Sequence, residues 1–118
     1  MPRTIIVEPS DVMRSLLEYV VAQMLGWEFY STVSGLQAWE LVQRVQPDLV
    51  IAEGHMRDLD GLELACRMQG HLSLSSVPVV LIDVLEAEAK AAGVAATITK
   101  PFGVEALVKT LTKVLDQR

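Results

Sequence analysis

The feature that most restricts the fold of this chain is a regular alternation between two hydrophobic patterns. Short apolar runs typical of buried strands alternate with segments whose apolar residues recur at helical spacing. The runs that predict strands lie at residues 4–7, 27–33, 49–52, 77–82 and 96–99. The segments that predict helices lie at residues 13–24, 34–45, 61–70, 85–92 and 104–115. Each predicted strand is therefore followed by one predicted helix.

This alternation predicts a layered α/β domain. Strands joined by single helices run parallel with right-handed crossovers, and nearly continuous apolar strands are typical of a sheet with helices on both faces. A chain of 118 residues is long enough for one hydrophobic core but too short for two. We therefore predict a single doubly wound α/β domain over residues 1–118. Its core should be mostly aliphatic, because aromatic residues make up only 5% of the chain.

Cap and turn residues set the predicted helix boundaries. Ser34 with Gln37, and Asp60 with Glu63, have the spacing of a capping box at a helix start. Residues 71–76 (HLSLSS) are predicted to form an exposed loop. The residues expected to end helices are Gly26, Pro47 and Gly93.

Charge and hydropathy argue against several classes of function. The chain has ten Lys and Arg residues and fifteen Asp and Glu residues, so its net charge is −5. Nucleic-acid-binding proteins usually carry a basic patch, which this composition does not indicate. No apolar run approaches the roughly 20 residues of a membrane span, and the first residues lack the apolar region of a signal peptide. Cys66 is the only cysteine and falls in a helical pattern, so we predict a reduced core residue. We expect a cytoplasmic protein that binds neither nucleic acid nor membranes.

Four predicted strands end on an ionisable residue. The first ends on Glu8, the third on Glu53, the fourth on Asp83 and the fifth on Lys100. In an open parallel sheet the functional crevice lies outside the carboxyl ends of the strands. These four side chains are therefore expected to meet at one edge of the sheet.

Several motifs resemble those of the response-regulator receiver family, in register from about residue 4 to the C-terminus. They are VEPSDVMR, SGLQAWEL, PDLVIAEGHMRDLDGLEL, VPVVLID and AAGVAATITKPF. The resemblance implies a flavodoxin-like fold with strand order 2-1-3-4-5. It also implies a role in two-component or phosphorelay signalling, in which an aspartate accepts a phosphoryl group from a histidine kinase. In that family two acidic residues after the first strand hold Mg²⁺ together with the aspartate. A Ser or Thr, a lysine and a mobile aromatic residue complete the site.

The chain departs from this pattern at most of the implied site positions. The phosphoacceptor position is Glu53, and the acidic pair is Glu8 followed by Pro9. The hydroxyl position is Asp83 and the switch-aromatic position is Thr97; only the phosphate-stabilising Lys100 is standard. Pro9 offers Mg²⁺ no carboxylate, and a glutamate places its carboxylate about 1.5 Å further out than an aspartate.

These departures suggest a hypothesis for Glu53. Its longer side chain could reach Lys100 in a permanent ion pair, so that it resembles the phosphorylated aspartate without being phosphorylated. Asp83 is predicted either to join this acidic pocket or to cap the helix after it. Three acids around one lysine carry an excess of negative charge, which a bound proton or cation could offset.

We expect no bound metal or cofactor, and Mg²⁺ only if the site is active. The residues that could hold a metal are Glu8, Glu53 and His55, the last through its backbone carbonyl or its imidazole. His55 is otherwise an exposed loop residue. Asp58 and Asp60 are predicted to be loop and cap residues and not phosphoacceptors.

We predict a degenerate receiver that is a protein-interaction module and not an enzyme. Its expected partners are a histidine kinase or an output protein, and a homodimer is possible. The family often uses the face formed by the fourth helix, fifth strand and fifth helix, but the fourth helix is short here. Two alternatives stay open: an autophosphorylating receiver with an unusual acidic cleft, and a small-ligand or metal sensor that uses the same pocket.

Overall fold

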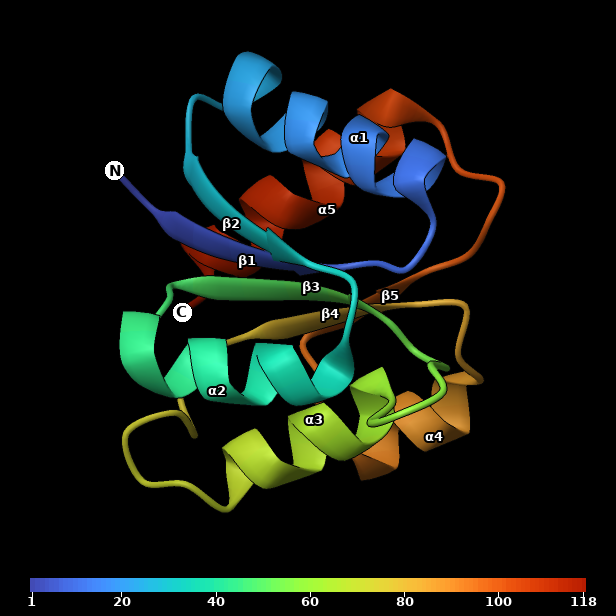
Figure 1. Ribbon diagram of the computed structural model, residues 1–118. Coiled ribbons are helices and arrows are strands. Elements are labelled where there is room, and N and C mark those ends of the chain that lie inside the picture. The colour runs from blue at the N-terminus through green and yellow to red at the C-terminus, as the bar shows by residue number, and fades with distance from the viewer.

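The computed structural model describes residues 1–118 and contains one sheet of five parallel strands (Figure 1). The strands are β1 (Arg3–Val7), β2 (Glu28–Thr32), β3 (Leu49–Glu53), β4 (Val79–Ile82) and β5 (Ala96–Ile98). They lie in the order β2-β1-β3-β4-β5, and every neighbouring pair is parallel. The predicted doubly wound sheet and its flavodoxin-like strand order are confirmed.

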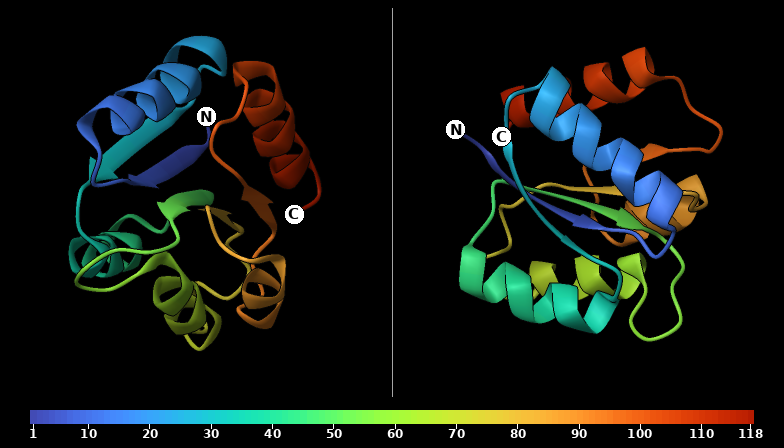
Figure 2. Two further views of the ribbon diagram at one scale, coloured as in Figure 1. Left: turned by 90° about the vertical axis from the view of Figure 1, so that its right-hand side faces the viewer. Right: turned by 45° about the horizontal axis from the view of Figure 1, so that its top comes forward.

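Helices cover both faces of the sheet. They are α1 (Asp11–Tyr19), the π-helix η1 (Val20–Met24), α2 (Gly35–Val45), α3 (Gly61–Gln69), α4 (Glu86–Ala91) and α5 (Val104–Asp116). α1 and α5 lie on one face, whereas α2, α3 and α4 lie on the other (Figures 1 and 2). α4 is as short as predicted. None of the helices combines the length and the apolar character needed to cross a membrane.

Alternating strand residues build a separate core layer on each face. Ile5 and Val50 point into the layer between the sheet and helices α2 and α3. Ile6 and Ile51 point into the layer between the sheet and helices α1 and α5. All four side chains are fully buried. The two layers hold the carboxyl ends of β1, β3, β4 and β5 together at one edge of the sheet, where the candidate site lies.

The segment predicted as the first helix is helical throughout, but it changes from an α-helix to a π-helix. α-Helical geometry stops at Tyr19, and the backbone N–H of Leu25 donates to the carbonyl of Val20 at 3.0 Å, five residues earlier. This wider turn keeps both Val20 and Val21 buried. Gly26 then ends the helix with a φ of +70°, in the left-handed region that glycine adopts readily.

Only half of each predicted capping box forms. The Ser34 hydroxyl accepts from the backbone N–H of Gln37, and the Asp60 carboxylate accepts from that of Glu63. The return bonds are absent, because the Gln37 side chain accepts from the Thr32 hydroxyl and Glu63 forms an ion pair with Arg67.

Two apolar residues differ from their predicted environments. Cys66 is exposed and not part of the core, because the buried side of α3 is formed by Leu64, Ala65 and Met68 and Cys66 points away from it. Leu74, in the segment predicted to be an exposed loop, is fully buried. It packs into the core layer between the sheet and helices α2 and α3, so this loop is anchored to the core.

Candidate functional site

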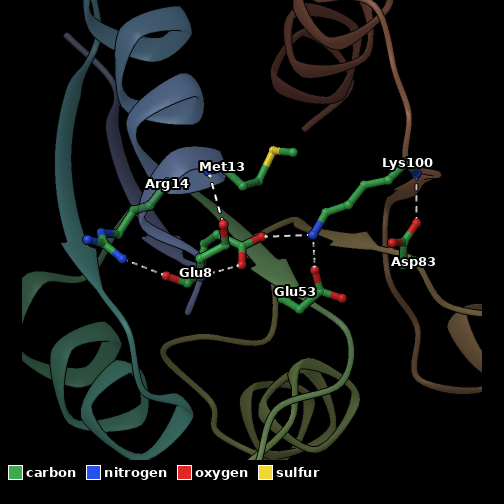
Figure 3. A network of polar contacts seen from close by, with 7 residues as sticks. Glu8, Met13, Arg14, Glu53, Asp83 and Lys100 are labelled. Atoms are coloured by element: carbon green, nitrogen blue, oxygen red, sulfur yellow. Dashed lines mark hydrogen bonds and ion pairs between the residues drawn. The ribbon is translucent and has the colours of Figure 1, made fainter.

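The ammonium of Lys100 lies between two carboxylates at the carboxyl edge of the sheet (Figure 3). Its Nζ is 2.8 Å from Oε2 of Glu53, the last residue of β3. It is also 3.4 Å from Oε1 of Glu8, which directly follows β1. Lys100 itself lies in the segment between β5 and α5. Parallel pairing thus brings together three residues that are far apart in the sequence, as predicted, and we call them the acid–lysine cluster.

Glu8 is held firmly in this cluster. Its side chain is only 2% exposed, and its second carboxylate oxygen accepts from the backbone N–H of Ser10 at 3.0 Å. Its backbone is bound as well, because its N–H donates to the carbonyl of Thr32 and its carbonyl accepts from the guanidinium of Arg14. Both carboxylate oxygens of Glu8 are therefore already used by donors of the protein.

The environment of Lys100 favours its charged form. Burial alone would lower the pKa of Lys100, but the hydrogen bond and charge of Glu53, with the charge of Glu8, outweigh that effect. The net result raises the pKa of Lys100 above its ordinary value of 10.5. The cluster thus contains a permanent internal cation shared by two acids.

Asp83 lies beside the cluster but does not join it. Its carboxylate accepts from the backbone N–H of Lys100 at 2.7 Å, and it forms no ion pair with the ammonium (Figure 3). A left-handed backbone with a φ of +58° directs the side chain this way. The prediction that Asp83 caps α4 is wrong, because the N-cap residue is Leu85. The backbone N–H of Leu85 donates to the carboxylate of Glu88. The expected pocket of three acids is a pair of acids with Asp83 next to it.

The other predicted site residues lie at the surface around this cluster. Pro9 is exposed between Glu8 and the start of α1, and Thr97 is exposed on the edge strand β5. His55 is exposed in the loop after β3. Nowhere in the chain do three His, Cys, Asp or Glu side chains come together in a way that could hold a metal ion. The imidazole of His55 therefore does not join the carboxylates of Glu8 and Glu53 in such a group.

Asp58 has a structural role that the sequence did not indicate. From the loop between β3 and α3 it reaches the start of α2, where its carboxylate accepts from the Ser34 hydroxyl and from the backbone N–H groups of Gly35 and Leu36. The hydrogen bond from Ser34, followed by those from the backbone of Leu59 and Leu36, holds the pKa of Asp58 well below its ordinary value of 3.8. Asp58 thus fastens the loop that follows Glu53 to α2.

The start of α2 also packs very closely against this loop. A Cβ atom added to Gly35 would lie 1.6 Å from the backbone oxygen of Leu59, so only glycine fits there. Asp58 and Gly35 together bring the β2–α2 and β3–α3 connections into one rigid rim beside the acid–lysine cluster.

The sequence of this chain matches a known protein family. The sequence model of the family described as "Response regulator receiver domain" matches residues 4–112. The polar-differentiation response regulator DivK of Brucella anthropi is 23% identical over 120 residues, which cover 98% of each protein. The transcriptional regulator RpaA of Synechocystis is also 23% identical, but the aligned part is only 49% of its length.

Solved structures have the same fold. The signal receiver domain of a histidine kinase from Syntrophus aciditrophicus superimposes with a TM-score of 0.90 at 24% identity, covering 99% of this chain and 92% of that one. The receiver domain of the sensor histidine kinase PA1611 from Pseudomonas aeruginosa gives a TM-score of 0.86 at 20% identity, covering 98% of both chains. That structure is described as having a magnesium ion coordinated in the active-site cleft.

Proposed function

This chain belongs to the response regulator receiver domain family, and we propose that it is a degenerate receiver, which signals by binding proteins and is not phosphorylated on residue 53. The observation that carries the proposal is the acid–lysine cluster. The ammonium of Lys100 occupies the space between Glu8 and Glu53 and already neutralises charge there. A site of this kind has its cation built in.

The donor set around Glu8 and Glu53 does not suit Mg²⁺. Magnesium requires near-octahedral coordination by oxygen and usually keeps several water molecules. Here Glu8 is 2% exposed and both its carboxylate oxygens are bound, while Pro9 has no carboxylate to offer. The proposal is therefore that magnesium binds this edge of the sheet weakly or not at all.

Glu53 is proposed to substitute permanently for a phosphorylated residue. Its carboxylate extends about 1.5 Å further than that of an aspartate, and it meets Nζ of Lys100 at 2.8 Å. Phosphoryl transfer depends on positioning and on neutralising charge. We propose that the longer side chain of Glu53, held by Lys100, is poorly placed to attack a phosphoryl donor.

The proposed partners are proteins of a two-component pathway, such as a histidine kinase or an output protein, in the cytoplasm. The net charge of −5 supports binding to proteins and not to DNA by this domain. The short α4, Glu86–Ala91, argues against the common dimer face of the family. A homodimer would need another surface.

The test is phosphorylation by acetyl phosphate in the presence of Mg²⁺, followed by measurement of the intact mass. The natural chain is expected to gain no phosphoryl group. The control is a triple variant, Pro9→Asp, Glu53→Asp and Asp83→Ser, which places two aspartates and a hydroxyl at the positions that the family uses. This variant is expected to bind Mg²⁺ and to gain mass.

A phosphoryl adduct on the natural chain, mapped to Glu53, would overturn the proposal in favour of a competent receiver with an unusual cleft. The single variant Pro9→Asp tests the metal argument separately. If its Mg²⁺ affinity equals that of the natural chain, the loss of a ligand at Pro9 does not explain weak metal binding.

A further inference from the structure

We infer that a pocket next to the acid–lysine cluster binds a small molecule with an apolar body and one anionic group. The pocket has a volume of about 550 Å³ and opens at the carboxyl edge of the sheet. Its walls come from the three connections that follow β1, β2 and β3. The pocket adjoins the site of the proposed function and shares Pro9 with it, but none of the three residues of the cluster lines it.

The walls of the pocket combine apolar and polar residues. Pro9 and Met56 contribute from the β1–α1 and β3–α3 connections, and Val33 contributes from the β2–α2 connection with 50% of its surface exposed. Small-molecule sites typically have volumes of roughly 300–1,000 Å³, apolar walls and a few polar groups that fix orientation. The volume of this pocket lies in that range, and its apolar residues stand beside polar ones that can orient a ligand.

The polar groups that remain free at the pocket are basic. Arg57 and His55 both line it. Arg57 forms no ion pair, whereas four other arginines each pair with an acid: Arg3, Arg14, Arg67 and Arg118. A guanidinium without a partner is well suited to bind a carboxylate, sulfonate or phosphate through two parallel hydrogen bonds.

The nearby acids form no ion pair with Arg57. Asp58 also lines the pocket, but its carboxylate is turned to the start of α2, where it accepts three hydrogen bonds. Glu53 is paired with Lys100. Asp58 stays ionised, but its oxygens are occupied by donors at the start of α2, so the N–H groups of the Arg57 guanidinium remain free at the pocket. These free donors favour a ligand that carries an anionic group.

The rim formed by Asp58 and Gly35 makes the pocket preformed. It joins the β2–α2 and β3–α3 connections, which supply Val33 and Arg57 to the walls. A ligand would therefore enter without ordering either loop, which lowers the cost of binding. A bound ligand would contact the loop that begins next to Glu53.

The test uses two fluorescent probes of similar shape and different charge. One is 8-anilino-1-naphthalenesulfonate, which carries a sulfonate, and the other is the uncharged N-phenyl-1-naphthylamine. The natural protein is expected to bind the sulfonate saturably at one site, and more tightly than the neutral probe. Arg57→Gln should weaken binding of the sulfonate by about tenfold and change binding of the neutral probe less than about twofold.

Two further variants make the test specific. Arg44 also lacks an ion pair but is exposed near the other end of α2, so Arg44→Gln should leave both affinities unchanged. Val33→Trp should fill the pocket and weaken both probes. Circular dichroism and urea unfolding verify that each variant is folded, which excludes probe binding to a partly unfolded chain.

The inference is overturned if the natural protein shows no saturable binding of the sulfonate. It is equally overturned if Arg57→Gln and Arg44→Gln have the same effect, or if Arg57→Gln weakens both probes equally. The titrations contain neither Mg²⁺ nor acetyl phosphate. A failure here therefore leaves the phosphorylation test, and the proposed function, unaffected.

Discussion

One ammonium group, that of Lys100, lies within ion-pair distance of two carboxylates at the ends of different strands. Removing one partner of a buried ion pair is usually more costly than the pair is worth, because the remaining charge is left without compensation. Glu8, 2% exposed, is the residue that would suffer most from the loss of Lys100. At this scale the cluster is an electrostatic unit with its own cation.

A double-mutant cycle tests which acid is coupled to the ammonium. Lys100→Met combined with Glu53→Gln should give a coupling energy of about 1–2 kcal/mol from urea unfolding. Lys100→Met combined with Asp83→Asn should give a coupling energy near zero, because Asp83 binds the backbone of Lys100 and not its side chain. Equal couplings for the two acids would contradict the described geometry.

The lowered pKa of Asp58 predicts that the stability of the fold decreases at acid pH. Its pKa is lowered in the folded state, so its contribution to stability is present above the ordinary value of 3.8 and is lost as the pH falls towards the folded value. Natural protein and Asp58→Asn are compared by urea unfolding at about pH 6 and about pH 3. The natural protein should be the more stable at the higher pH, by about 1 kcal/mol, and the difference should shrink at the lower pH. A difference that does not depend on pH would show that the charge of Asp58 is irrelevant.

At the scale of elements, the contact between α2 and the β3–α3 loop leaves no space for a side chain at the start of the helix. Gly35 begins α2 directly against the backbone of Leu59. Two connections that are far apart in the sequence are held together by this contact and by Asp58. The rim of the proposed pocket depends on both.

Gly35→Ala is therefore expected to destabilise the fold by about 2 kcal/mol or more, since the added Cβ would overlap a backbone oxygen. Gly70→Ala is the matched control at the end of α3. There the nearest atom to an added Cβ is 3.7 Å away and φ is −82°, so alanine fits. The control should change stability by no more than about 0.5 kcal/mol. Thermal unfolding of both variants measures the difference, and comparable losses would refute the packing described for α2.

Elements were largely predictable from the sequence because hydrophobic periodicity and cap residues are local signals. The strands, the short α4 and the ends of helices at Gly26 and Gly93 follow from such signals. The π-helical turn after Tyr19 was not predictable, because apolar spacing does not distinguish it from an α-helix. The exposure of Cys66 depends on which side of α3 is buried, and that is fixed only by packing.

The candidate site was predictable in membership but less so in geometry. Glu8, Glu53 and Lys100 could be placed together because parallel strands bring their carboxyl ends to one edge. The direction of Asp83 could not be predicted, since it depends on a left-handed backbone at that residue. The bond from Asp58 to the start of α2 spans more than 20 residues, and no local pattern marks it.

At the scale of the whole molecule, the chain has the complete fold of a receiver domain. The five-stranded sheet and both helical layers match solved receiver domains with TM-scores of 0.86 to 0.90. Under the proposed function, Glu53, Pro9 and Asp83 at the carboxyl edge replace the residues that the family uses for chemistry. On this proposal, the scaffold keeps a surface that binds partners after the chemistry has been lost.

The most direct test of the central claim is an amide NMR titration of the natural chain with Mg²⁺, followed by addition of beryllofluoride. If Lys100 is the built-in cation, the amide signals of Glu8, Glu53 and Lys100 should not shift saturably with Mg²⁺, and no beryllofluoride adduct should form. Saturable shifts at these residues, together with an adduct on Glu53, would show that the edge of the sheet still binds the metal and a phosphoryl analogue, and would contradict the account.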